Sequence, residues 1–140
     1  SMEYAKQLLQ GKYPAAPKFS VMISHVKDVA KAHVLSLSNK RAGGRRLIVG
    51  SEVRSILELS QIMAKNIPSH AKKLPKRELP NFMVKLLSYI DTSAKTMVPD
   101  LGLKMQTDQT YAEDILQMKF TASEIAVVDA AKSVIRLNLA

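Results

Sequence analysis

The spacing of apolar residues changes at Asp28, and this change constrains the fold more than any other feature of the sequence. In FSVMISHV, residues 19–26, Phe19, Val21 and Ile23 alternate with Ser20, Met22 and Ser24, which is typical of a strand buried mainly on one face. From Asp28 the apolar spacing is helical and continues to about residue 38. The helical positions are Val29, Ala32, His33 and Leu37. A strand that leads directly into a helix indicates a mixed α/β fold.

Asp28 stands at this junction, with His25 and His33 on either side. Aspartate is among the preferred N-cap residues, because its carboxylate accepts hydrogen bonds from the free amides of the first turn. We therefore expect Asp28 to be a structural helix cap. The alternatives are a catalytic role or a zinc site, but the two histidines would lie on different elements, no third ligand is near in sequence, and no common metal-ligand spacing is matched.

A second strand and helix are expected further along. RRLIVG, residues 45–50, follows the turn residues Gly43 and Gly44 and reads as a buried strand. Ser55 and Glu58 have the spacing of a capping box, which predicts a helix from Ser55 to about Ile67. The order helix, strand, helix over residues 28–67 predicts an α/β layer with parallel strands.

The remaining segments read mainly as helices and loops. Residues 3–10 predict a helix that ends at Gly11, and the proline-rich segments 12–18 and 68–80 predict extended connections. Helical spacing recurs over residues 81–98 and 109–117, the latter capped by Thr107 or Asp108. Thr121 and Glu124 have capping-box spacing before a final helix, whose expected apolar stripe is Ile125, Val128, Ala131 and Ile135.

Composition limits the function classes. The 140 residues are enough for one domain, and Ser1 and Met2 read as a tag remnant. The absence of cysteine excludes disulfides, thiolate metal sites and cysteine nucleophiles, and it fits a cytoplasmic protein. No apolar stretch is long enough for a membrane span, and the start of the sequence does not read as a signal peptide.

The net charge of +9 raises the question of a nucleic-acid partner. Eight of the 21 basic residues lie in two short segments, 40–46 and 72–77, which read as loops because they adjoin glycine or proline. Aromatic residues, which stack on bases in many nucleic-acid interfaces, make up only 5% of the chain. Solvated loops are therefore favoured over a nucleic-acid interface.

No catalytic or cofactor-binding motif is present. The sequence lacks a glycine-rich phosphate loop, a Walker motif and a Gly-x-Ser-x-Gly elbow. None of the tyrosines is followed by a lysine four residues later, and the carboxylate pairs are most simply solvated. The residues alone therefore indicate an α/β piece without a catalytic constellation.

The order of motifs resembles the C-terminal half of extended short-chain dehydrogenases/reductases, in the NAD-dependent epimerase/dehydratase family. HVKDVAKAHVLSL matches the histidine-valine-x-aspartate-valine-alanine segment of the dihydroflavonol 4-reductase and cinnamoyl-CoA reductase group. LLQGKYPAAP, GGRRLIVGSEVRSILELSQIM, LPKRELP, LGLKMQTDQTYAEDIL and TASEIAVVDAAKSVIRLNL match in order and spacing, so that the resemblance covers residues 3–139. Gln117 departs from the pattern, because the group usually has glycine there.

The resemblance implies a Rossmann-like α/β fragment with few short strands and about five helices, in which residues 3–140 form a single substrate-binding part. Members of the family bind NADP(H) or NAD(H) on an N-terminal Rossmann half and reduce a ketone or aldehyde with a tyrosine and a lysine four apart. These positions would all lie upstream of Glu3. The fragment alone is therefore expected to bind no cofactor and to be inactive. The alternative is a stand-alone ligand-binding or protein-interaction module.

By the same resemblance, the expected substrate-binding residues are Tyr13, Pro14, Phe19 and Met22. For Phe19 and Met22 a plain core role is equally compatible with the pattern. Lys76 and Arg77 are weaker candidates for an anion site. Without the missing half, the strands at 19–26 and 47–50 would expose unpaired backbone and an apolar face, which predicts a homodimer or a domain swap. No nucleic-acid or membrane partner is expected.

Overall fold

The computed structural model describes residues 2–89, 95, 98–103 and 105–140, and these form a mixed α/β fold with six α-helices and four short strands. This confirms the predicted fold class. The α-helices are α1 (Met2–Leu9), α2 (Val26–Ser38), α3 (Ile56–Asn66), α4 (Asn81–Leu87), α6 (Thr110–Leu116) and α7 (Ser123–Arg136). The strands are β1 (Ala16–Pro17), β2 (Ser20–Ile23), β3 (Glu52–Ser55) and β4 (Glu78–Leu79). Three 3₁₀ turns are η1 (Lys40–Ala42), η2 (Pro68–His70) and η3 (Val98–Asp100).

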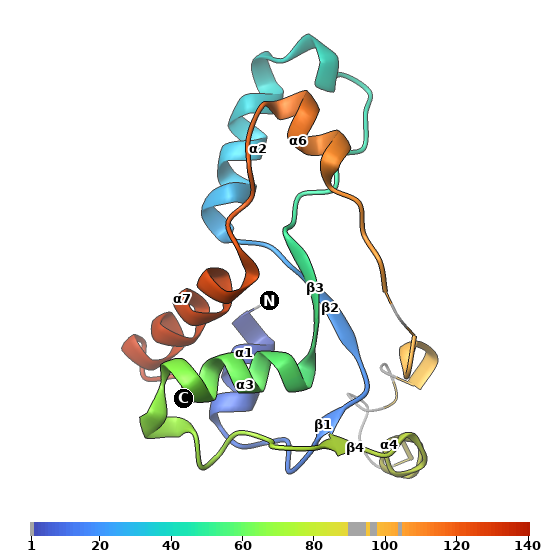
Figure 1. Cartoon of the computed structure of the whole chain (residues 1–140), viewed down its shortest axis with the longest axis vertical. Helices are drawn as coiled ribbons and strands as arrows, with labels where there is room; N and C mark the ends of the chain where they lie inside the picture. Colours follow the sequence, from blue (N-terminus) through green and yellow to red (C-terminus); the bar gives the residue numbers. More distant parts are fainter. Residues whose placement is uncertain (1, 90–94, 96–97, 104) are drawn as a thin grey trace.

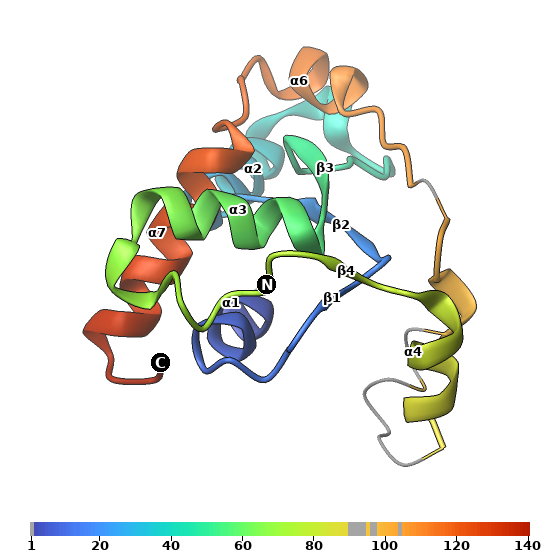
Figure 2. The ribbon, with the colours of Figure 1, turned by 60° about the horizontal axis from the view of Figure 1, so that its bottom comes forward.

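The main core lies where α1, α3 and α7 pack together (Figure 2). Five of its apolar side chains are almost completely buried: Leu8, Leu9, Ile56, Met63 and Val134. β1 and β2 border this core, whereas α4 lies away from it, on the far side of β1 and β4 (Figures 1 and 2). Burial of these large side chains is the main source of stability, at about 1.5–3 kcal/mol for each.

A second, smaller core lies between α2 and α6, at the other end of the molecule in Figure 1. Its buried residues are Ala32, Ile115, Leu116 and Met118, against which Leu47 and Val49 also pack. The paired strands β2 and β3 run from this end towards β1 and β4 (Figure 1). Between the two cores the start of α2 lies beside α7, where His25 Nε2 is 3.3 Å from Asp129 Oδ2.

The strands form two two-stranded sheets, which corrects the predicted parallel layer. β2 and β3 pair antiparallel, with Ser20 opposite Ser55 and Ile23 opposite Glu52, whereas only the two-residue strands β1 and β4 are parallel. The strand predicted at residues 45–50 is also wrong, because these residues carry no ladder and the strand begins at Glu52. Leu47 and Val49 are partly buried and Ile48 is 39% exposed. A strand also needs a hydrogen-bonded neighbour, which a pattern along one chain cannot supply.

Asp28 is not the N-cap of α2. The helix begins two residues earlier, and His25 is its N-cap, with its Nδ1 accepting a hydrogen bond from the amide of Lys27. His25 and His33 thus belong to one helix and its cap, not to different elements. Asp28 lies in the first turn, where its Oδ2 accepts from the amide of Thr121 at 2.6 Å. Its carboxylate therefore joins α2 to the segment before α7.

The other caps divide into confirmed and wrong predictions. The capping box of Ser55 and Glu58 is present at the start of α3. The one predicted for Thr121 and Glu124 is absent, because Ala122 is the N-cap of α7 and no side chain caps it. Asp108 accepts hydrogen bonds from the amide and hydroxyl of Thr110, although the N-cap position of α6 is Gln109.

Two predicted helical stripes are rotated relative to the structure. On α7 the buried residues are Ser123, Ala126, Val127, Ala131 and Val134, whereas Ile125 is 54% exposed. On α2 only Ala32 is buried, and Leu37 is 89% exposed. Apolar residues occupy more than one face of each helix, so the spacing alone did not decide which face packs.

The ends of two helices depend on left-handed backbone. Gly11, with a φ of 71°, ends α1 as predicted. Gln117 ends α6 with a φ of 50° and a ψ of 44°, a conformation that favours glycine. The helix predicted over residues 81–98 is present as α4 up to Leu87, and much of the remainder lies outside the described residues.

Candidate binding cleft

A cleft of about 910 Å³ lies on one side of the main core. Its walls come from α1, the end of β2, the start of α2, and α7, while α3 contributes part of the floor. The floor is apolar, and its most buried members are Ala5, Ile23, Leu59, Met63, Ala126 and Val127. Clefts that bind ligands have this combination of concave shape and apolar lining.

The rim of the cleft is cationic. Lys27 comes from the first turn of α2, and Lys132 and Arg136 come from α7. All three are exposed, and none has an ion-pair partner among the described residues. Lys132 and Arg136 are four residues apart on one helix, a like-charge spacing that mildly destabilises a helix. The open charges make the cleft attractive to an anionic group.

The one carboxylate on the rim is already engaged. His25 is 8% exposed, and its Nε2 lies 3.3 Å from Oδ2 of Asp129. Because Nδ1 accepts from the amide of Lys27, the neutral ring carries its proton on Nε2 and donates it to Asp129. Both ring nitrogens are occupied, so His25 ties α2 to α7 and is not placed to act as a general base.

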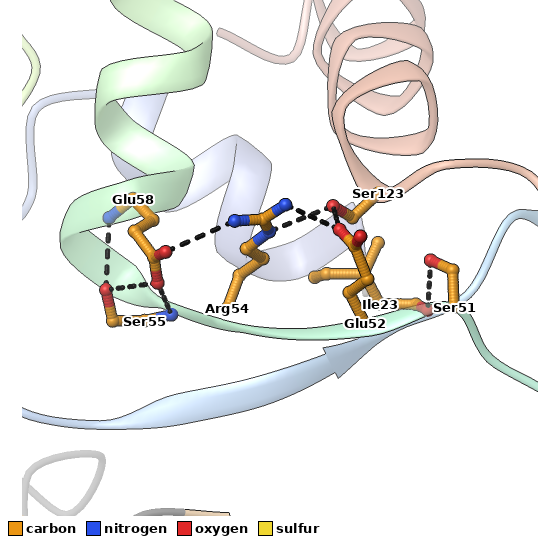
Figure 3. A network of polar contacts seen from close by, with 7 residues as sticks. All are labelled: Ile23, Ser51, Glu52, Arg54, Ser55, Glu58 and Ser123. Carbon is orange, nitrogen blue, oxygen red and sulfur yellow. Dashed lines mark hydrogen bonds and ion pairs between the residues drawn. The ribbon is translucent and has the colours of Figure 1, made fainter. Parts of the chain in front are cut away.

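A polar network lies where β3 meets the starts of α3 and α7 (Figure 3). Arg54 is its centre: Nη2 contacts Glu52 at 2.5 Å, Nη1 contacts Glu58 at 3.3 Å, and Nε donates to Ser123 at 3.0 Å. The Ser123 hydroxyl also donates to Glu52, and Glu58 closes the capping box with Ser55. Each of these side chains has a partner within the network, which therefore joins β3 to the starts of α3 and α7.

The charges in this network shift one another. The pKa of Glu52 is lowered, first by the Ser123 hydrogen bond and then by Arg54. The pKa of Glu58 is lowered, first by the hydrogen bond from the Ser55 backbone amide, and Glu52 raises the pKa of Arg54. Both carboxylates are therefore held in the ionised form, which suits a structural role.

The expected substrate residues do not gather around the cleft. Tyr13 hydrogen-bonds Gln7 and packs against the main core, and Pro14 is exposed. Phe19 also packs against this core, with its ring 6.3 Å from that of Tyr4, and Met22 lies against Gly50. None of the four lines the cleft.

Lys76 and Arg77, the weaker anion candidates, are exposed. Lys76 borders a separate cavity of about 230 Å³ near Ser60 and Leu74, whereas the Arg77 carbonyl accepts from the amide of Ala16. The cleft itself was missed in the sequence, because its walls come from segments more than 100 residues apart. The only signal was the pair of basic residues four apart on the final helix.

Over residues 2–89, 95, 98–103 and 105–140, no three histidine, aspartate or glutamate side chains come together in a way that could hold a metal ion. In the same residues, no helix combines the length and hydropathy needed to span a bilayer.

Comparison with known proteins gives structural matches alone. No family model and no curated protein sequence matches the chain. Gre2 from Candida albicans matches with a TM-score of 0.69 and 22% identity over 97% of this chain. Yeast methylglyoxal/isovaleraldehyde reductase Gre2, solved with NADPH, matches with a TM-score of 0.67 and 18% identity over 99% of this chain. A reductase engineered for asymmetric catalysis matches with a TM-score of 0.66 and 24% identity over 95% of it.

The share of each reductase chain that this chain covers is much smaller. The chain spans 37% of the C. albicans Gre2 chain, 41% of the yeast one and 35% of the engineered reductase. The fold of this chain is therefore the fold of part of these reductases.

Proposed function

We propose that this chain is the C-terminal, substrate-binding part of an NAD(P)-dependent reductase of the extended short-chain type, which reduces a ketone or aldehyde. The observation that carries the proposal is the match of nearly the whole chain to reductases, two of whose solved structures contain NADPH. The segment HVKDVAKAHVLSL supports a dihydroflavonol-reductase-like or cinnamoyl-CoA-reductase-like member. On this proposal the cofactor site and the catalytic tyrosine and lysine belong to polypeptide outside this chain.

An unpaired segment next to β3 supports the idea that other polypeptide completes the fold. The amides of residues 46–50 have no hydrogen-bond partner among the described residues. Leu47 and Val49 pack inward while Ile48 is 39% exposed, which is the alternation of a strand. The row of amides without a protein partner and the strand-like alternation together give this segment the character of a strand without its neighbour.

The exposed side of α2 also supports the idea that other polypeptide completes the fold. Val26, Val34 and Leu37 are 76%, 66% and 89% exposed, and they lie at helical spacing on one face. Large apolar side chains that are exposed together on one helix face are often covered by another protein segment. We propose that the cofactor-binding part covers the strand-like segment 46–50 and this face, and that a chain produced alone forms a homodimer or a domain swap through them.

The test is NADPH or NADH oxidation, followed at 340 nm, with a small aldehyde and an aromatic aldehyde as substrates. The chain alone is expected to give no turnover and no increase in melting temperature with either nucleotide, because the nucleotide site is elsewhere. The same chain extended by the polypeptide encoded immediately upstream is expected to be active. Turnover by the chain alone, or an inactive extended protein that binds neither nucleotide, contradicts the proposal.

The cationic cleft favours one alternative, a stand-alone ligand- or protein-binding module without catalysis. The upstream reading frame separates the two functions. A glycine-rich turn followed by a tyrosine and a lysine four apart favours the reductase, and an open reading frame that begins at this chain favours the module.

A further inference from the structure

We propose that the cleft between α1, α2 and α7 is the seat of an acidic amphipathic helix supplied by a polypeptide other than this chain. The inference goes beyond the reductase proposal, because it rests on the shape and charge of the cleft alone. Where the reductase proposal holds, the helix belongs to the polypeptide that carries the cofactor site.

The size of the cleft suits a helix. At about 910 Å³, the cleft has room for the side chains along one face of a helix of about two turns, which is about 11 Å long. The floor is apolar over its length, from Ala5 on α1 to Val127 on α7. A helix that places one apolar stripe in such a groove is a common mode of recognition.

The charges of the rim decide the character of that helix. Lys27, Lys132 and Arg136 are unpaired among the described residues, while Asp129 is held by His25. Carboxylates on both flanks of an inserted helix would reach these cations and relieve the like-charge spacing on α7. A basic helix would add to the existing repulsion. Acidic flanks around an apolar stripe are therefore the complementary pattern.

A second copy of this chain fits the cleft less well. The cationic rim calls for an acidic occupant, whereas each chain has a net charge of +9. The short helix α6 carries two adjacent carboxylates, but Glu113 is paired with Lys119, Asp114 is paired with Arg41, and the apolar side is buried in the second core. Among the described residues, this acidic helix is thus already engaged.

The experiment uses a fluorescein-labelled peptide of about 15 residues, long enough to form a helix on binding. The probe has leucines at helical spacing with glutamates on both flanks. One control peptide replaces the glutamates with lysines, and a second keeps the composition but scrambles the leucine stripe. Binding to the 140-residue chain is measured by fluorescence anisotropy. The acidic probe is expected to bind and both controls to bind at least about tenfold more weakly, because they lack the charge or the stripe.

Charge reversal locates the binding. Lys132→Glu on the rim is expected to weaken binding of the acidic probe by about fivefold, and Arg136→Glu should act similarly. Lys85→Glu, at an exposed position on α4 that does not line the cleft, makes the same change in net charge and is expected to leave binding unchanged. Raising the salt from about 0.1 M to about 1 M shortens the Debye length from about 10 Å to about 3 Å and should weaken binding.

The remaining outcomes overturn the proposal. No binding of the acidic probe, equal binding of the three peptides, or equal loss of binding in Lys132→Glu and Lys85→Glu would each do so. If decanoate displaces the acidic probe, and the scrambled peptide binds as tightly as the probe, the cleft would be assigned to a small amphipathic anion instead. A dimer in light scattering that Lys132→Glu dissociates and Lys85→Glu does not would assign the cleft to a second copy. NADPH turnover, measured separately, reports on the reductase proposal and leaves these results unaffected.

Discussion

Replacing Arg54 with methionine tests whether the network in Figure 3 holds β3, α3 and α7 together. Methionine keeps most of the length and the apolar stem of the side chain, so the change removes charge and hydrogen bonds more than packing. It leaves Glu52 and Glu58 without their shared cation. The hydroxyl of the buried Ser123 also loses the guanidinium as a donor.

The magnitude follows from the three contacts. Glu52 and Glu58 are 50% and 44% exposed, so each ion pair contributes only about 0.2–1 kcal/mol. The hydrogen bond to Ser123 adds about 0.5–1.5 kcal/mol. The free energy of unfolding should therefore fall by about 2 kcal/mol at pH 7. For a chain of 140 residues this corresponds to a loss of about 6–8 °C in melting temperature.

The loss should depend on pH in a defined direction. In the folded chain the pKa of both carboxyls lies below the ordinary value of 4.5, so the folded state binds fewer protons than the unfolded state in that range. Their contribution to the free energy of unfolding is complete above pH 4.5, and it is lost as the pH falls through their lowered pKa values. The difference between Arg54→Met and the parent chain should therefore shrink below pH 4.5.

Thermal and urea unfolding, followed by circular dichroism at pH 7 and at pH 3.5, measure this difference. Lys85→Met on α4 is the matched control, since Lys85 is exposed and outside the network. A double-mutant cycle with Glu52→Gln isolates the strongest pair. A destabilisation by Arg54→Met that is the same at both pH values, or that equals the effect of Lys85→Met, would refute the electrostatic account of the network.

Three further changes probe local features of the fold. Gln117→Gly should stabilise the chain by about 1 kcal/mol in urea unfolding, because φ is 50° there; a loss of stability would show that the Gln117 side chain contributes more than the backbone costs. Asp28→Ala should cost about 1–2 kcal/mol, because the Thr121 amide loses its acceptor, whereas Asp28→Asn should cost less; equal costs would contradict this account. Ile48→Pro should lower the dimer fraction in size-exclusion chromatography with light scattering, because it removes an amide from the unpaired segment; a parent chain that stays monomeric at high concentration would contradict the proposed assembly.

Helix caps, helix ends and other features that depend on neighbouring residues were predictable from the sequence. Ser55 and Glu58 form their capping box because both partners lie within one turn, and Gly11 ends α1 because its backbone is free to adopt positive φ. The change of apolar spacing near Asp28 likewise located a strand followed by a helix, although the helix begins two residues earlier. Such features depend on contacts within a few residues, so the order of amino acids determines them.

Features that depend on distant partners were decided only by the tertiary structure. The sequence predicts Asp28 to be a helix cap, but in the structure its carboxylate accepts a hydrogen bond from the amide of Thr121, 93 residues away. LIVG reads as a strand, but a strand exists only where a second one pairs with it, and the described residues supply none. The cleft is the largest case: an apolar floor and three cations from α1, α2, α3 and α7 become a site only when packing brings those helices together. Periodicity shows which residues avoid water, and the fold alone determines which neighbours they meet.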